Sequence, residues 1–333
     1  MTRGHLIAAA LCLIALIALP MVLEATGNRY LIGTVTRVFF YAIAAMSLNL
    51  ILGFGGMISF GHAAYFGVGA YVVGILSFHG AEGIPIFGLP GTENALIAWP
   101  LAVLISALAA ALIGALALRT TGVYFIMTTL AFAQMLFFLF VSLEQYGGDD
   151  GLFMSAGRSE VPLIDIEGRT TFYFVSMICC ALFFWFTHAL IHSPFGRVLK
   201  GIKQNEPRMR ALGAPTYTYK LVAFAIAGGG AGLAGVLSAN HTEFVSPDIL
   251  HWTKSGELMI MVILGGLGTL LGPILGAAAF LILEEFLPVI FDMLGLDLLQ
   301  EHWRIVFGPL LIIVVLMTRS GLHGALFRKR GAS

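Results

Sequence analysis

Long apolar segments alternate with short polar ones from one end of this chain to the other. The apolar segments cover about residues 6–23, 31–52, 57–78, 95–118, 122–142, 172–192, 221–240 and 305–317, with a longer block at 258–283. Most of them are long enough to cross about 30 Å of hydrocarbon as helices. The pattern therefore predicts an all-α integral membrane protein that forms one polytopic domain over residues 1–333, with about ten transmembrane helices.

Two apolar regions need a specific interpretation. The first segment, Leu6–Leu23, is longer than the core of a usual signal peptide, and no small-x-small cleavage site follows it directly, so we favour a retained helix over a signal peptide. The block at 258–283 is too long for one ordinary helix and is interrupted by several glycines and by Pro273. It predicts two helices joined by a tight turn.

The composition agrees with a membrane protein and excludes other classes. Apolar residues make up 59% of the 333 residues and charged residues only 11%, whereas a soluble domain has about 25% charged residues. The net charge of zero leaves no basic face for nucleic acid. The three cysteines lie in apolar runs without the spacing of a disulfide or metal framework, so we expect no metal and no cofactor.

The distribution of basic residues predicts the orientation. With ten spans and both termini cytoplasmic, the inner side holds twelve of the eighteen basic residues: Arg3, Arg119, Arg197, Lys200, Lys203, Arg208, Arg210, Lys220, Arg319, Arg328, Lys329 and Arg330. Glu206 is the one acid on that side. Since basic loops stay inside, this predicts a multi-pass membrane protein whose acidic loop at 142–171 lies on the outer side.

A polar, basic island at 193–219 interrupts the second half of the chain. Asn205 is a suitable N-cap, Gly213 can take the left-handed position after a helix, and Pro215 prevents continuation. These signals predict a short helix over residues 206–212. Because Met209 and Leu212 give it an apolar surface, the helix either docks on another protein or the island binds anionic lipid head groups. The spacing alone does not separate the two.

Three stretches contain polar or glycine residues at membrane depth. Residues 49–71 place Asn49, Ser59 and His62 among six glycines, and Gln134 lies deep in a later span. Irregular backbone in a membrane is tolerated only beside protein or a water-filled cavity, so these four residues are candidate pathway-lining residues. The alternative is close helix packing, with His62 as a satisfied interhelical donor. The glycines of residues 264–276 echo the first stretch and hint at an internal repeat.

These motifs resemble the permease subunits of bacterial ABC importers for branched-chain amino acids, in particular the LivM-like branch. The resemblance covers about Asn49 to Leu322 and is carried by residues 49–71, the GGDDGL sequence at 147–152, the loop from SPFGR to Gly213 and the LGGLGTLLGP block. The sequence departs from the commonest pattern at Pro207, Arg208 and Asp149.

The resemblance implies a location in the bacterial inner membrane, with the loop 142–171 in the periplasm. It also implies a function and a set of partners. The chain would be the transmembrane permease of an ATP-driven importer of hydrophobic amino acids, working with ABC ATPase subunits, a second LivH-like permease, a periplasmic substrate-binding protein and membrane lipid. The segment 206–212 would be a coupling helix that contacts the ATPase. The residues expected to carry that contact are Asn205, Glu206, Met209, Leu212 and Gly213.

Several alternatives remain at this stage. Close relatives in the family carry urea or short amides, and a secondary transporter or channel would keep the same helices. The chain has no P-loop, so we do not expect it to be an enzyme or to bind the nucleotide itself. His188 and His192, one helical turn apart, could share a metal, but interfacial histidines are favoured. Glu284 and Glu285 are interpreted as interfacial residues at a helix end.

Overall fold

The computed structural model describes residues 3–85, 90–154, 157–162, 165–295, 302–317, 321, 322 and 324. Arg319 and the basic group at 328–330, used above to predict orientation, lie outside the described residues, as does the side chain of Arg3.

The fold is almost entirely helical. Its helices are α1 (Arg3–Ala25), α2 (Tyr30–Asn49), the π-helical turn η1 (Leu50–Phe54), α3 (His62–Glu82), α4 (Ala95–Ala117), α5 (Val123–Val141), η2 (Glu144–Tyr146), α6 (Arg169–His192), α7 (Pro194–Gln204), α8 (Glu206–Ala211), α9 (Thr216–Thr242), η3 (Pro247–Leu250), α10 (Trp252–Gly265), α11 (Gly272–Met293) and α13 (Trp303–Met317). Two short strands, β1 (Leu152–Phe153) and β2 (Phe244–Val245), pair antiparallel.

Seven helical segments of the described chain are long and apolar enough to cross a membrane. They are residues 30–54, α3, α4, α5, α6, α9 and α11. The predicted membrane class and the helical pair in the block at 258–283 are confirmed, since α10 and α11 flank a tight turn. α10 and α13 have only 14 and 15 residues, so the total of ten spans and the cytoplasmic termini stay predictions.

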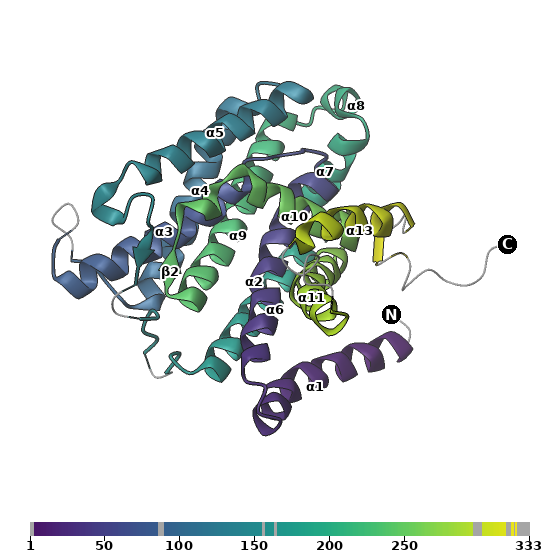
Figure 1. The fold of residues 1–333 in the computed structure, drawn as a ribbon. Helices are drawn as coiled ribbons and strands as arrows, with labels where there is room; N and C mark the ends of the chain where they lie inside the picture. The colour runs from purple at the N-terminus through teal and green to yellow at the C-terminus, as the bar shows by residue number, and fades with distance from the viewer. Residues whose placement is uncertain are drawn as a thin grey trace.

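Helix α9 occupies the centre of the bundle and packs against α2, α3 and α4 (Figure 1). Glycines on α9 make this possible, because a Cβ on Gly235 would lie 1.8 Å from the Phe66 carbonyl oxygen of α3. Such small-residue contacts let membrane helices approach closely. Around α9 lies a core that includes Tyr65, Phe224 and Met46, all of them buried.

The outer helices expose apolar surface, as a lipid-facing wall requires. On α4, leucines repeat every four residues at 104, 108, 112 and 116, and each is between 52% and 71% exposed. A cavity between α4 and α5 has no polar lining residue. In a soluble protein such a surface would be an aggregation site, whereas here lipid covers it.

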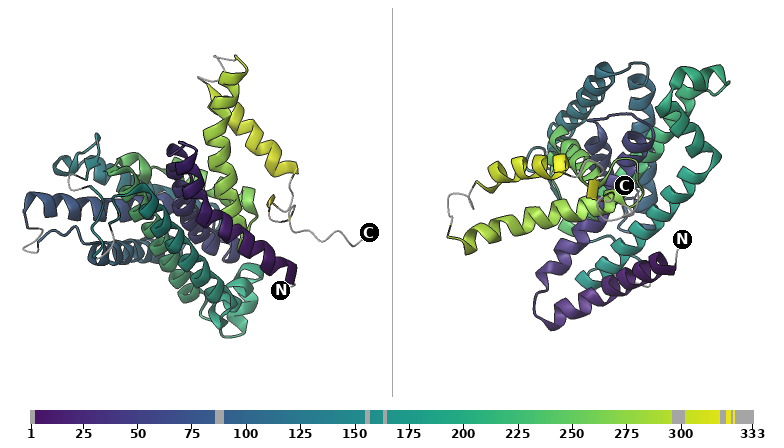
Figure 2. Two further views of the ribbon diagram at one scale, coloured as in Figure 1. Left: turned by 90° about the horizontal axis from the view of Figure 1, so that it is seen from below. Right: turned by 90° about the vertical axis from the view of Figure 1, so that its right-hand side faces the viewer.

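The two ends of the bundle differ. One end, called the sheet end, carries β1, β2 and the loop 142–168. The opposite end, called the α8 end, carries α7, α8, η1 with the irregular segment 55–61, and the turn 266–271. Helices α11 and α13 stand out together from the rest of the bundle (Figure 2). α1 contacts the first turns of α6, where the Tyr173 hydroxyl donates to the Leu16 carbonyl oxygen at 2.8 Å.

Candidate functional site

The basic island contains two helices rather than one. The predicted short helix is confirmed as α8, with the Asn205 side chain accepting a hydrogen bond from the Arg208 N–H at 3.0 Å. Gly213 follows it with φ of 84°, the left-handed conformation expected after the helix end. The preceding helix α7 was missed, although Ser193 caps it and Pro194 starts it, the usual signals of a helix N-terminus.

Glu206 fixes α8 to the start of α9. Its carboxylate accepts hydrogen bonds from Lys220, from Arg210 at 2.6 Å and from Thr216 at 3.1 Å. Burial raises the pKa of Glu206, but the hydrogen bonds from Lys220 and Arg210 outweigh it and hold the pKa below its ordinary value. The carboxylate is therefore ionised at neutral pH. It anchors α8 through an ion pair with Lys220, and the side chains of Glu206 and Lys220 are only 24% and 17% exposed.

The apolar residues of α8 have different surroundings. Met209 packs on α7, because a Cβ on Gly201 would lie 2.7 Å from its sulfur. Leu212, by contrast, is 72% exposed at the tip of the loop. An exposed leucine beside Arg208 and Arg210 gives this tip the mixture of apolar and basic groups that a protein partner can bind.

At the α8 end the two glycine-rich breaks touch each other, and this contact is called the glycine junction (Asn49, Gly53, Gly268 and Thr269). Asn49 is buried and uses both ends of its amide: Nδ2 donates to the Thr269 carbonyl oxygen at 2.8 Å, and Oδ1 accepts from the Gly268 N–H at 3.0 Å. A Cβ on Gly53 would lie 2.6 Å from the Gly268 nitrogen. The helix–break–helix unit 30–82 is thus joined to the similar unit 252–293 by the Asn49 side chain and by the close approach of Gly53 to Gly268.

Helix α7 contacts this junction directly. The Lys203 ammonium donates to the Gly53 carbonyl oxygen at 2.5 Å, a group freed by the π-helical turn. Lys203 also packs beside Gly56, since a Cβ there would lie 3.0 Å from the Lys203 Cγ. Nearby, the Lys200 ammonium lies 5.5 Å from the centre of the Phe54 ring. The loop that carries α8 is therefore tied to the broken part of the membrane helices.

The other predicted pathway residues lie inside the bundle. Ser59 and His62 are fully buried, and His62 Nε2 lies 2.7 Å from the Ser47 hydroxyl oxygen. Because that hydroxyl donates to the Ala44 carbonyl oxygen, we assign the proton to Nε2, which leaves Nδ1 as a buried acceptor without a partner in the described chain. Gln134 is half-buried, and its Nε2 also has no partner among the described atoms. Only Asn49 of the four is brought to the glycine junction.

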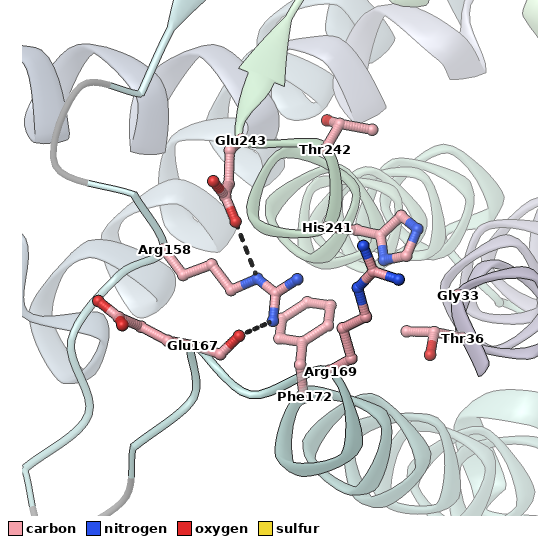
Figure 3. A pocket seen from close by; sticks show the side chains of 9 residues that line it. All are labelled: Gly33, Thr36, Arg158, Glu167, Arg169, Phe172, His241, Thr242 and Glu243. Atoms are coloured by element: carbon pink, nitrogen blue, oxygen red, sulfur yellow. Dashed lines mark hydrogen bonds and ion pairs between the residues drawn. The ribbon is translucent and has the colours of Figure 1, made fainter. Parts of the chain in front are cut away.

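At the sheet end, a polar pocket of about 380 Å³ lies where α2, α6 and α9 meet the loop 142–168. Figure 3 shows its nine lining residues, which include Arg158, Arg169, His241 and Glu243. Arg158 is 9% exposed and donates to the carbonyl oxygens of Asn240, Ile166 and Glu167 at 2.9 to 3.0 Å.

Charge and backbone strain both concentrate at this pocket. Burial lowers the pKa of Arg158, the carboxylate of Glu243 at 3.4 Å opposes that shift, and Arg169 adds to it. Glu243 has φ of 56°, which non-glycine residues rarely adopt. Because most Arg158 donors reach backbone carbonyls, its principal role is to fix the loop 142–168 onto the end of α9.

Charged residues also occur inside the long helices, where the sequence interpretation was wrong. Glu284 and Glu285 do not lie at a helix end but within α11, and each is 3.5 Å from the Arg37 guanidinium of α2. Sequence spacing could not reveal this cluster, because its members lie far apart in the chain. The rings of His188 and His192 lie 4.3 Å apart and are tilted, with His192 Nδ1 2.7 Å from the His188 carbonyl oxygen. No set of three potential metal ligands occurs in the described chain.

Comparison with known proteins places the chain in a family. The model of the family described as "Branched-chain amino acid transport system / permease component" matches residues 30–315. The chain is 26% identical to the LivM permease protein of Escherichia coli, over 96% of this chain and 76% of that protein. It is 25% identical to the probable LivM permease of Methanocaldococcus jannaschii, over 85% and 90% respectively.

A more distant relative is named for a different cargo. The autoinducer 2 import system permease protein LsrC of Salmonella typhimurium is 27% identical over 53% of this chain and 49% of its own length. No solved structure matches the chain. Since the family model covers residues 30–315, most of the chain, this protein belongs to the branched-chain amino acid transport system permease family.

Proposed function

We propose that this chain is the transmembrane permease subunit of an ATP-driven importer that moves branched-chain amino acids into the cytoplasm. The observation that carries the proposal is the family match over residues 30–315 in a chain with seven membrane-length apolar helices. The LivM relatives are named as permeases of branched-chain amino acid transport systems. They favour this cargo over urea or short amides, and a subunit of an importer over a self-sufficient channel.

The α8 end is proposed to face the cytoplasm. Seven basic residues lie in its loops and helices: Arg119, Arg197, Lys200, Lys203, Arg208, Arg210 and Lys220. Glu206 is the one acid in those segments, and it is neutralised by Lys220 and Arg210. The sheet end carries the acidic loop 142–168 and would face the periplasm, where a substrate-binding protein would dock.

Within this orientation, α8 is the proposed coupling helix. An ATPase subunit would contact Leu212 and the basic residues beside it, while Asn205, Gly213 and Glu206 hold the helix in shape. Motion of α8 would reach the membrane through α7, because Lys203 is hydrogen-bonded to Gly53 at the glycine junction. A second permease of the same family would complete the translocation pathway.

The Lys203 contact can be tested by removing its charge. In the complete transporter, Lys203→Met is expected to leave ATP hydrolysis near its normal rate and to lower amino acid uptake severalfold, because the ATPase loses its link to the junction. Arg197→Met is the matched control, since Arg197 lies on the same helix, is exposed and has no described side-chain contact to the junction. Equal uptake by the Lys203 and Arg197 variants would contradict the proposed link.

Asn49, Ser59, His62 and Gln134 remain proposed pathway residues. Three of them are buried in this conformation, so they would have to become exposed in another state of the transport cycle. Single cysteines at 49, 62 and 134 are expected to react with a water-soluble thiol reagent during ATP turnover and not at rest. If none reacts in any state of the cycle, these residues have packing roles only.

The proposed function is tested by isolating the chain gently from its native membrane and identifying its partners by mass spectrometry. Recovery of an ABC ATPase and a second permease, followed by ATP-dependent leucine uptake in vesicles with the periplasmic binding protein, is the expected result. Repeated recovery of the chain alone would instead support an ATP-independent transporter or channel.

A further inference from the structure

Five charged side chains gather on one side of the bundle, and we name this surface the charged face (Arg37, Lys254, Glu257, Glu284 and Glu285). Arg37 of α2 lies 3.5 Å from both Glu284 and Glu285 of α11. On α10, the Lys254 ammonium lies 2.7 Å from the Glu257 carboxylate and 5.9 Å from the Tyr41 ring of α2. Two cations and three carboxylates thus share one surface formed by three helices.

Arg37 and Glu284 lie well inside helices of membrane-spanning length. Arg37 is seven residues from the start of α2, which corresponds to about 10 Å along the helix axis. Glu284 is nine residues from the end of α11, or about 13 Å. Both positions fall within helices long enough to span about 30 Å of hydrocarbon, away from the ends of those helices.

The charged face is also open. The side chains of its five residues are between 23% and 37% exposed in the isolated chain, so the ion pairs do not bury them. Charged groups at this depth avoid lipid and face water or protein. The leucine face of α4 shows the opposite composition, with Leu112 71% exposed. The two surfaces therefore suit different surroundings: lipid at the leucines of α4, and water or protein at the charged face.

The charges match a particular class of ligand. A free amino acid is neutral overall but carries a full ammonium and a full carboxylate, and moving it into an apolar passage would cost both hydration shells. A surface with carboxylates and an arginine side by side can bind the ammonium and the carboxylate at once. The side chains of these pairs are only partly buried, so part of each charged group stays accessible for further hydrogen bonds.

We propose that the charged face of α2, α10 and α11 lines a water-filled pathway and forms a transient site for the zwitterionic head of an amino acid. This inference rests on the proposed import function and assigns its route through the chain. Its carboxylates receive the ammonium group, and Arg37 receives the α-carboxylate. The charged face makes no contact with the apolar side chain of the substrate. The external binding protein would therefore select which amino acid is carried.

Accessibility is tested in the complete transporter, in vesicles, with the native cysteines replaced by serine. Glu285→Cys is expected to react with a membrane-impermeant thiol reagent and to be protected by millimolar L-leucine. Leu112→Cys, on the lipid face, is the control and is expected to stay unreactive. Absence of reaction at 285 in every state of the ATP cycle would overturn the inference.

The ligand class is tested by the protecting molecule. Leucine is compared with isoamylamine, which lacks the carboxylate, and with 4-methylpentanoate, which lacks the ammonium. The zwitterion is expected to protect at concentrations at least about tenfold lower than either analogue, a difference of ~1.4 kcal/mol. Equal protection by all three molecules, or protection by none of them, would overturn a zwitterion site.

A charge-removing variant gives an independent measure. Glu284→Gln keeps the side-chain shape and is expected to lower leucine uptake about tenfold with the assembly intact. Uptake equal to that of the unsubstituted transporter would contradict a role in substrate contact. Uptake by the unsubstituted transporter tests the import function separately, so normal uptake with an unreactive residue 285 overturns only the route assigned here.

Discussion

Glu206→Lys is expected to lower ATP-driven uptake at least about tenfold while the chain stays folded in the membrane. The substitution replaces the acceptor of Lys220, Arg210 and Thr216 with a third positive charge. Loss of charged hydrogen bonds of this kind costs about 1.5–3 kcal/mol each at most, less where solvent screens them. This is enough to release α8 locally and too little to unfold the bundle. Uptake in vesicles and the amount of chain in the membrane are measured together.

Two further variants sharpen this test. The double variant Glu206→Lys with Lys220→Glu restores an opposite-charge pair and is expected to recover part of the uptake. Gly213→Pro is expected to match the single lysine variant, because proline cannot adopt φ of 84° and removes the N–H that donates to the Arg210 carbonyl oxygen. Normal uptake in both Glu206→Lys and Gly213→Pro would refute the coupling role of α8.

Gly53→Ala is expected to destabilise the chain and to abolish most of its uptake. The added Cβ would lie 2.0 Å from the Asn49 Oδ1 and 2.6 Å from the Gly268 nitrogen, so the junction must separate to admit it. Overpacking of this kind typically costs about 1–3 kcal/mol. The expected measurements are a lower Tm in detergent and a loss of uptake.

Gly256→Ala in α10 is the matched control for this substitution. It adds the same methyl group to a helical glycine, but nothing lies within 4 Å of the new Cβ. Its Tm is expected to be unchanged or slightly higher, since alanine is the better helix former. If the two alanine variants have the same Tm and uptake, close contact at the glycine junction does not matter for folding or transport.

The sequence predicted those features that depend on neighbouring residues. Apolar segment lengths located the membrane helices, and Asn205 and Gly213 marked the ends of α8 because caps act within one helical turn. Pro273 and its glycines marked the turn between α10 and α11 for the same reason. Even here one local element was missed: α7 is amphipathic and basic, so its charges suggested a loop although Ser193 and Pro194 mark its start.

Features that depend on tertiary contact were not predictable from one sequence. Arg37 and Glu284 are 247 residues apart, and no periodicity connects them. Asn49 was chosen as a polar residue among glycines, but its partners at 268 and 269 come from the second broken unit. The similar glycine patterns of residues 49–71 and 264–276 indicated that the two stretches are related. They did not indicate that the stretches touch.

The glycine junction has a consequence for how such a protein can diverge. Each of its hydrogen bonds has a main-chain group on one side: the carbonyl oxygens of Gly53 and Thr269 and the N–H of Gly268, which bind the side chains of Lys203 and Asn49. Main-chain groups are the same whatever side chains surround them. Mutations that adapt the charged face to another cargo would therefore leave this contact intact, and selection could act on the two separately. A permease of this design can evolve to carry other nutrients or signalling molecules while the contact between its two broken helix units stays unchanged.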